Sequence, residues 1–209
     1  MNAENKNSIN DYDVIVLAAG ESNRFSKGNK LLFKINHYSI LINVIKEICL
    51  TNMNNILVVT GFEHKIIQNS LRKYAVKVIQ NKHYSKGISS SISLGIKNLS
   101  RNSQAVMICL ADMPLIKSAN YNQLLSFHHK YGGREWITAP RKNQVIGNPI
   151  IWGAVYYEEL LKLKGDLGGK QILKKFKQNL KFCDVESKSF FIDIDTEKDL
   201  YHCNKSTIL

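Results

Sequence analysis

A loop with the composition of a phosphate-binding site follows the first apolar run of the chain. The run at residues 14–17 continues into the small residues 18–20, which allow backbone N–H groups to approach a ligand closely. Successive N–H groups in such a turn form an anion-binding nest. Arg24 and Lys30, further along the loop, add a forked guanidinium and a point charge for phosphate oxygens. The loop therefore predicts a site for a phosphorylated ligand.

Acidic residues occur where a metal ion could bridge to those phosphates. Asp112 follows the apolar run 106–110, and ligands of open α/β sheets bind outside the carboxyl ends of strands. Asp195, with Asp193 as second choice, offers another carboxylate near the C-terminus. Carboxylates of this kind can hold Mg²⁺ against a nucleoside triphosphate. The structural alternatives are an Asp112 that caps the next turn and an Asp195 that caps the final helix.

Apolar, β-branched runs alternate with helical patterns in the first half of the chain. This alternation predicts βαβ units and one α/β domain with a mostly parallel central sheet. The expected strands are residues 14–17, 56–59, 76–79, 106–110, 136–139, 149–152, 180–185 and 190–194. The expected helices are residues 39–50, 63–74, 89–99, 119–131, 154–163 and 168–178, with a last one from Thr196.

A serine-rich segment opens one of these helices. Asn81 precedes it, and Gly87, Ser89, Ser90 and Ser91 lie at the helix start. Hydroxyls and free N–H groups at such a start can hold a base or a ribose, although an ordinary helix cap would use the same residue types.

Composition limits the possible classes of protein. The chain has 209 residues, 44% of them hydrophobic and 22% charged, which suits one folded domain. The formal charge of +12 comes from scattered lysines, so it indicates a basic surface more than a nucleic-acid interface. The four cysteines lack metal-ligand spacing, which favours a reducing cytoplasm. No apolar run reaches the roughly 20 residues that span a bilayer, so no membrane partner is expected.

The first loop resembles the signature LAAGxSxRxGxxK of the MobA-like nucleotidyltransferases. Ser26 replaces the usual glycine, and Lys30 lies one residue further from Arg24 than in the family, which leaves Lys27 as an alternative counterpart. The resemblance implies a Rossmann-like nucleotidyltransferase fold with three layers, α/β/α. It also makes Arg24, Lys30 and Asp112 catalytic, with Asp112 and Asp195 as ligands of Mg²⁺ or Mn²⁺. The nucleotide-binding residues that it implies are Leu17, Ala18, Ala19, Gly20, Ser22, Arg24, Lys30, Asn81, Gly87, Ser89, Ser90 and Ser91.

Three features resemble the molybdenum cofactor cytidylyltransferase branch of that family. They are LAAG rather than LAGG, the GNP element at 147–149, and a GDxG element in which Lys170 replaces the family arginine. The acceptor-binding residues implied are Gly147, Asn148, Pro149, Asp166 and Gly168. The implied reaction moves CMP from CTP to the phosphate of molybdopterin and releases pyrophosphate, and a molybdenum hydroxylase is a possible recipient of the product.

Alternatives stay open for both activity and partner. One is a guanylyltransferase, or another NTP transferase with a different phosphorylated acceptor. A second is a non-catalytic carrier of the molybdenum cofactor, which retention of both Asp112 and Asp195 disfavours. The expected organisation is a flexible tail at 1–12 and one domain at 13–209. Residues from about 13 to 115 would bind nucleotide, and those from about 116 to 209 would bind acceptor.

Overall fold

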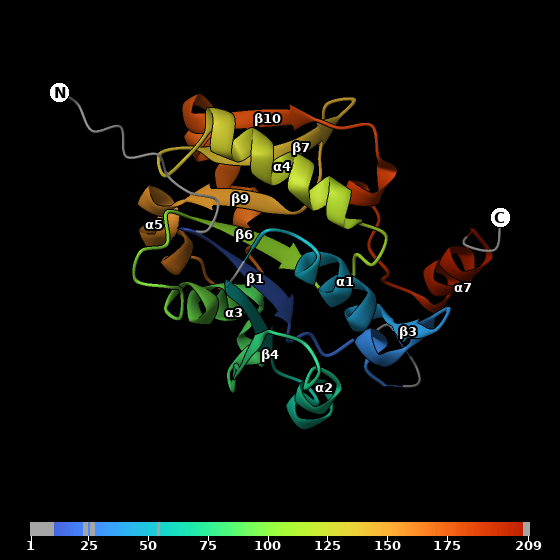
Figure 1. The fold of residues 1–209 in the computed structure, drawn as a ribbon. Coiled ribbons are helices and arrows are strands. Elements are labelled where there is room, and N and C mark those ends of the chain that lie inside the picture. The colour runs from blue at the N-terminus through green and yellow to red at the C-terminus, as the bar shows by residue number, and fades with distance from the viewer. Residues whose placement is uncertain (1–10, 23–24, 26–27, 54, 207–209) are drawn as a thin grey trace.

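The structure, a computed structural model, describes residues 11–22, 25, 28–53 and 55–206. Within these residues one eight-stranded sheet forms the centre of the molecule, in the order β10-β7-β9-β6-β1-β4-β5, with β8 paired to β7 (Figure 1). Its strands are β1 (Tyr12–Ala18), β4 (Asn55–Thr60), β5 (Lys77–Gln80), β6 (Ala105–Leu110), β7 (Ile137–Lys142), β8 (Val145–Ile146), β9 (Ile150–Gly153) and β10 (Leu180–Asp184). A separate hairpin pairs β2 (Lys34–Ile35) with β3 (Tyr38–Ser39).

The sheet is mostly parallel, as the sequence predicts. Strand β1 pairs in parallel with both β4 and β6, so that Leu17 is level with Val59 on one side and Leu110 on the other. Every residue of β1 is buried, in keeping with a strand that is covered on both faces. Strand β9 runs antiparallel to its two neighbours, β6 and β7. The carboxyl ends of β1, β4 and β6 consequently meet at one edge of the sheet.

Helices cover both faces, which gives the predicted three layers. The α-helices are α1 (Ile40–Cys49), α2 (His64–Ser70), α3 (Ile88–Ile96), α4 (Ser118–Tyr131), α5 (Tyr157–Leu161), α6 (Gly169–Ile172) and α7 (Glu197–Ser206). The 3₁₀ helices are η2 (Lys30–Leu32), η3 (Tyr84–Lys86), η4 (Ala154–Tyr156), η5 (Leu173–Asn179) and η6 (Lys188–Phe191). Side chains of α1, α2 and α4 share one core with the sheet, and those of α3, α5 and η5 share the other. Figure 1 shows α1 and α4 lying across the same face.

Helix α1 illustrates how the sequence determines these elements. The Ser39 hydroxyl accepts the backbone N–H of Ile42 at 3.3 Å and so caps the helix start. Ile40, Val44 and Ile48 then recur at spacings of four and are fully buried. A capped helix with one apolar stripe must pack that stripe on a core, and the sheet supplies it.

Three expectations about local structure are wrong. Residues 190–194 do not form a strand: η6 covers the first two, and the rest follow an irregular path. The helices expected at 154–163 and 168–178 are each divided, into η4 and α5 and into α6 and η5, and the backbone of Phe176 within η5 is not helical. Tyr12, the last residue of the expected tail, is the first residue of β1 and is fully buried. The first ten residues of the expected tail lie outside the described residues.

Within the described part of the chain, no helix combines the length and the apolar character needed to cross a bilayer.

Candidate active site

A cavity of about 550 Å³ opens at the edge where the carboxyl ends of β1 and β6 meet. The loop after β1, the start of α3 and the end of β6 form its walls. Ten of the residues predicted to bind nucleotide or metal line it: Leu17, Ala18, Ala19, Gly20, Ser22, Lys30, Gly87, Ser91, Asp112 and Asp195. The fold therefore places segments from the first, middle and last parts of the chain around one cavity.

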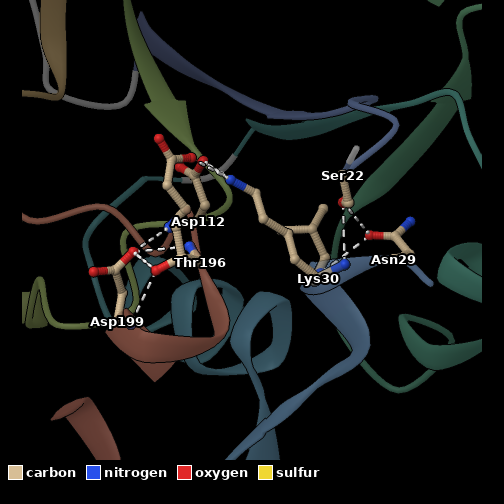
Figure 2. A network of polar contacts seen from close by, with 8 residues as sticks. Ser22, Asn29, Lys30, Asp112, Thr196 and Asp199 are labelled. Carbon is tan, nitrogen blue, oxygen red and sulfur yellow. Dashed lines mark hydrogen bonds and ion pairs between the residues drawn. The ribbon is translucent and has the colours of Figure 1, made fainter. Parts of the chain in front are cut away.

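Lys30 lies between the two carboxylates predicted to bind a metal. Its Nζ donates to Asp112 Oδ2 at 2.7 Å and to Asp195 Oδ1 at 2.9 Å. Figure 2 shows the side chain of Lys30 extending from its loop to Asp112. The Lys30 side chain is 15% exposed and that of Asp112 20%, so the ion pair is largely screened from water.

Two backbone features bring Asp195 to Asp112. The N–H of Ile194 donates to the carbonyl of Asp112 at 2.9 Å, which holds the segment before α7 against the end of β6. Asp199 Oδ2 then accepts the N–H groups of Asp195 and Thr196 at 3.2 and 2.8 Å, and the Thr196 hydroxyl accepts the N–H of Asp199 at 3.2 Å. This is a capping box. Thr196 and Asp199, visible in Figure 2, thus cap α7, and the Asp195 carboxylate faces Lys30 instead.

Side-chain hydrogen bonds also fix the backbone around Lys30. Its N–H donates to Ser22 Oγ at 3.0 Å, and Asn29 Oδ1 accepts the N–H of Leu31 at 3.1 Å (Figure 2). Asn29 is buried and begins η2 as its cap. Ser22 adopts a left-handed backbone, with φ of 58°, which turns its hydroxyl back to this position.

Burial and charge shift the pKa values of Lys30 and Asp112. Burial alone would lower the pKa of Lys30, but the Asp112 and Asp195 carboxylates outweigh it and raise the pKa above the ordinary value. Burial raises the pKa of Asp112, and the Lys30 ammonium counteracts part of that effect. At neutral pH the site therefore holds a charged lysine.

The donor set fits a divalent cation. Asp112 Oδ1 is buried and has no hydrogen-bond partner among the described residues, so one oxygen remains available as a ligand. Mg²⁺ commonly takes one or two carboxylates from a protein and completes its shell with phosphate and water. Groups of three or more His, Cys, Asp or Glu able to hold a metal are absent from the described residues. Asp193, the second choice, is exposed.

The serine-rich segment divides into lining and supporting residues. Asn81 is buried, and its amide donates to Ser90 Oγ and Ser91 Oγ at 2.8 and 2.9 Å. The Ser90 hydroxyl donates to the Gly87 carbonyl at 2.8 Å. Gly87 and Ser91 line the cavity, whereas Asn81, Ser89 and Ser90 are not among the described residues that do so. These three residues shape the start of α3, and their contact with a nucleotide remains a prediction.

A second, more apolar slot of about 210 Å³ adjoins the first cavity. The two share Leu17, Ile88, Leu110 and Asp166. The other walls of the slot are Ile92, Ile108, Asn148, Ile150, Trp152, Gly168, Gly169, Lys170 and Gln171.

Of the residues predicted to bind an acceptor, Asn148, Asp166 and Gly168 line this slot. Gly147 and Pro149 are buried beside it, and the 148–149 peptide bond is cis. The N–H of Asn148 donates to the Phe190 carbonyl at 2.9 Å, which fixes the entry into β9.

Sequence reasoning missed the apolar walls. Ile108 and Leu110 on β6, and Ile150 and Trp152 on β9, are spaced by two residues and so face the same side of the sheet. That spacing is the only feature of the sequence that could have indicated these walls, but residues of an ordinary core have the same spacing. Tyr84 of the first cavity was also missed. Arg24, predicted to be catalytic, and its neighbour Lys27 lie outside the described residues.

The fold and the site together define a nucleotidyltransferase: an α/β protein with an acidic centre and a small-residue loop at the carboxyl edge of its sheet. The chain belongs to the family of the MobA-like NTP transferase domain, whose model matches residues 14–180.

Two curated relatives each match more than half of this chain. The bifunctional protein GlmU of Oceanobacillus iheyensis is 24% identical over 143 residues, which is 68% of this chain and 30% of GlmU. The chain thus spans less than a third of the length of that relative. The 2-phospho-L-lactate guanylyltransferase of Methanocaldococcus vulcanius is 26% identical over 165 residues, 77% of this chain and 69% of the relative.

Solved structures share the fold at low identity. Rv0371c from Mycobacterium tuberculosis in complex with manganese is 18% identical, with a TM-score of 0.77 over 93% of this chain and 98% of that one. A CMP:2-keto-3-deoxy-manno-octonic acid synthetase complexed with CTP is 10% identical, with a TM-score of 0.76 over 94% of this chain and 98% of that one.

Proposed function

We propose that the protein transfers CMP from CTP to the phosphate of molybdopterin, or of its molybdenum-bearing form, and releases pyrophosphate. The observation that carries this proposal is the junction of the two pockets. One is polar and contains Lys30, Asp112 and Asp195, and the other is apolar and adjoins it through shared walls. A donor nucleotide and an acceptor with a flat ring system would meet at that junction.

The reaction balances without a strong base. An oxygen of the acceptor phosphate attacks the α-phosphorus of CTP, and the bond to the β-phosphate bridging oxygen breaks with its electron pair on pyrophosphate. Since the attacking oxygen is already anionic, no proton has to be removed, and catalysis reduces to positioning and charge stabilisation. The small-residue loop at 18–20 would hold the triphosphate, and Lys30 would offset the charge that builds on it.

Asp112 and Asp195 are the proposed ligands of Mg²⁺ or Mn²⁺. Both carboxylates bond to the one ammonium of Lys30, and this short separation supports their binding a common cation. When bound, the cation supplies Lewis-acid stabilisation of the phosphate oxygens. The complex of Rv0371c with manganese supports a divalent cation in a protein of this fold.

The proposal of cytosine as the base rests on the LAAG loop and on the GNP and GDxG elements of the sequence. The second candidate is a guanylyltransferase with another phosphorylated acceptor, which the 26% identity to 2-phospho-L-lactate guanylyltransferase favours. A cytoplasmic location, a molybdenum hydroxylase as recipient and the division near residue 115 stay predictions. The four free cysteines agree with a reducing compartment.

Pyrophosphate release tests the proposal. Each of the four NTPs would be supplied with Mg²⁺, with and without molybdopterin, to the wild type, Asp112→Asn and Asp193→Asn. We expect release that needs CTP and molybdopterin, is lost in Asp112→Asn and is retained in Asp193→Asn, because Asp193 is exposed. Release with GTP and with no other NTP would overturn the proposal that the transferred nucleotide carries cytosine. Binding of molybdopterin without release from any NTP would establish the carrier.

A further inference from the structure

The Lys30 ammonium occupies the space between the carboxylates of Asp112 and Asp195. It lies 2.7 Å from one oxygen and 2.9 Å from the other, so both carboxylates share the same positive charge. A divalent cation that bridges the two oxygens now bonded to Lys30, Asp112 Oδ2 and Asp195 Oδ1, would lie about 2.0–2.3 Å from each of them. It would therefore overlap the position of Nζ, and two cations cannot share that space.

Only the side chain of Lys30 is free to move out of this position. The backbone N–H of Lys30 is bound by Ser22 Oγ, and the next residue, Leu31, is buried and bound through its N–H to Asn29. Beyond the Cα atom, Lys30 has a flexible four-carbon stem with an ammonium that can reach different acceptors. The loop can thus stay in place while the charge changes partners.

We propose that Lys30 acts in two positions: it closes the empty carboxylate pair against bare divalent cations, and it moves to the triphosphate when a metal–nucleotide complex enters. The assignment of the triphosphate rests on the proposed function. The closing of the empty pair rests on the contacts with Asp112 and Asp195 alone.

Electrostatics give the order of binding. A bare cation would have to expel an ammonium that has two carboxylate partners and is largely buried, and the expelled ammonium would gain only hydrogen bonds to water in return. A metal–nucleotide complex brings phosphate oxygens as new partners for the ammonium. The nucleotide and the cation therefore bind cooperatively, and Lys30 is the residue that couples them.

The test measures Mn²⁺ binding by electron paramagnetic resonance, in which the signal of free Mn²⁺ is lost on binding. The proteins are wild type, Lys30→Met and Lys34→Met, each empty and with α,β-methylene-CTP, which cannot be turned over. Lys34→Met is the matched control, since it removes the same charge from an exposed residue four positions away.

We expect Lys30→Met to raise the affinity of the empty protein for Mn²⁺ at least about 10-fold and to lower the affinity for the Mn²⁺ complex of the analogue. Lys34→Met should change neither by more than about 2-fold. The double variant Lys30→Met/Asp195→Asn should lose the gain for bare Mn²⁺, which assigns the gain to this site. If Lys30→Met does not fold, Lys30→Gln replaces it.

Unchanged or weaker binding of bare Mn²⁺ by Lys30→Met would overturn the proposal, and so would tighter binding of both the bare ion and the complex. Failure of the proposed function has a different signature. In that case the analogue would leave Mn²⁺ binding to the wild type unchanged, while Lys30→Met would still gain affinity for the bare ion.

Discussion

The N–H of Ser89 donates to the carbonyl of Gly165 at 3.1 Å, and this bond joins the helix beside the polar cavity to the loop beside the apolar slot. The contact is close because Gly87 carries no side chain. A Cβ there would lie 2.3 Å from the carbonyl carbon of Gly165 and 2.6 Å from Asp166 Oδ1.

Gly87→Ala should separate the two pockets. Its φ of 94° disfavours alanine, and the added methyl would push away the loop at 165–168. We expect a loss of about 1–3 kcal/mol in the free energy of unfolding. The KM for the acceptor should increase more, relative to the wild type, than the KM for the nucleotide. Urea denaturation and steady-state kinetics measure the two effects. Gly20→Ala is the control for stability, since a Cβ there meets nothing within 4 Å. A variant as stable as the wild type would contradict the clash.

Thr196→Ala should weaken both the fold and the metal site. The substitution removes the hydroxyl that caps α7 and bonds to Asp199, and with it part of the support for Asp195. We expect a loss of about 1 kcal/mol in the free energy of unfolding and weaker binding of Mn²⁺ with nucleotide. Ser39→Ala removes the cap of α1 and should cost a similar stability with no effect on Mn²⁺. Equal Mn²⁺ affinities in Thr196→Ala and Ser39→Ala would show that the cap of α7 does not support the metal site.

His128 should make the fold sensitive to acid. It is fully buried on α4, its Nδ1 lies 2.8 Å from Thr138 Oγ1, and burial lowers its pKa to about 4. The unfolded chain, with a histidine pKa near 6.5, takes up the proton first as the pH falls. The free energy of unfolding should therefore fall by roughly 3 kcal/mol between pH 6.5 and 4 and be flat above pH 7.

Urea denaturation across that range checks the slope, which should be smaller in His128→Gln. His129→Gln, at the exposed neighbouring residue, should retain the wild-type slope. Equal slopes in all three proteins would assign the acid sensitivity to other groups.

Lys170 should recognise the acceptor. Its Nζ donates to the Ile146 carbonyl at 2.9 Å at the edge of the apolar slot, and burial of that ammonium lowers its pKa although the residue as a whole is exposed. A charge-assisted bond to an acceptor anion contributes about 1.5–3 kcal/mol. Lys170→Gln should raise the acceptor KM roughly 10-fold or more and leave the KM for nucleotide unchanged, whereas Lys170→Arg should remain near wild type. Lys174→Gln controls for loss of surface charge, and a matching rise in that variant would refute a specific role.

The strands and helices of the first half could be predicted because local pattern and tertiary position agree there. Val14 and Val16 face one core, while Ile15 and Leu17 face the other, so an apolar run is what the site of β1 requires. Residues 190–194 have an equally strand-like pattern. There Phe190 and Ile194 are both fully buried, and the N–H of Ile194 bonds to Asp112 rather than to a strand. Long-range contacts, which no local pattern contains, decide that segment.

For the site, the sequence identified charged and small residues but not their geometry. The residue types at Asp112, Asp195 and Lys30 and their places after strands indicated a common edge. That the lysine lies between the carboxylates depends on the Ile194–Asp112 bond, which joins distant parts of the chain, and on the Ser22–Lys30 bond within the loop after β1. The walls of the apolar slot could not be distinguished from core, because Trp152 and Ile150 have the same residue types and spacing in either role.

The antiparallel strand β9 has a consequence for how specificity can change. Because β9 is antiparallel to β6, the start of β9 lies at the same edge of the sheet as the carboxyl ends of β1 and β6, and Asn148 lies at that start. The β7–β8 hairpin that leads into it, with an exposed tip at Asn143 and Gln144, takes no part in the walls described for the polar cavity. We expect changes in the length or sequence of that hairpin to act on the apolar slot, through Asn148 and the bond from Lys170 to Ile146, and to leave the walls of the polar cavity unchanged. The ligand preferences of the two pockets could then evolve separately on one sheet.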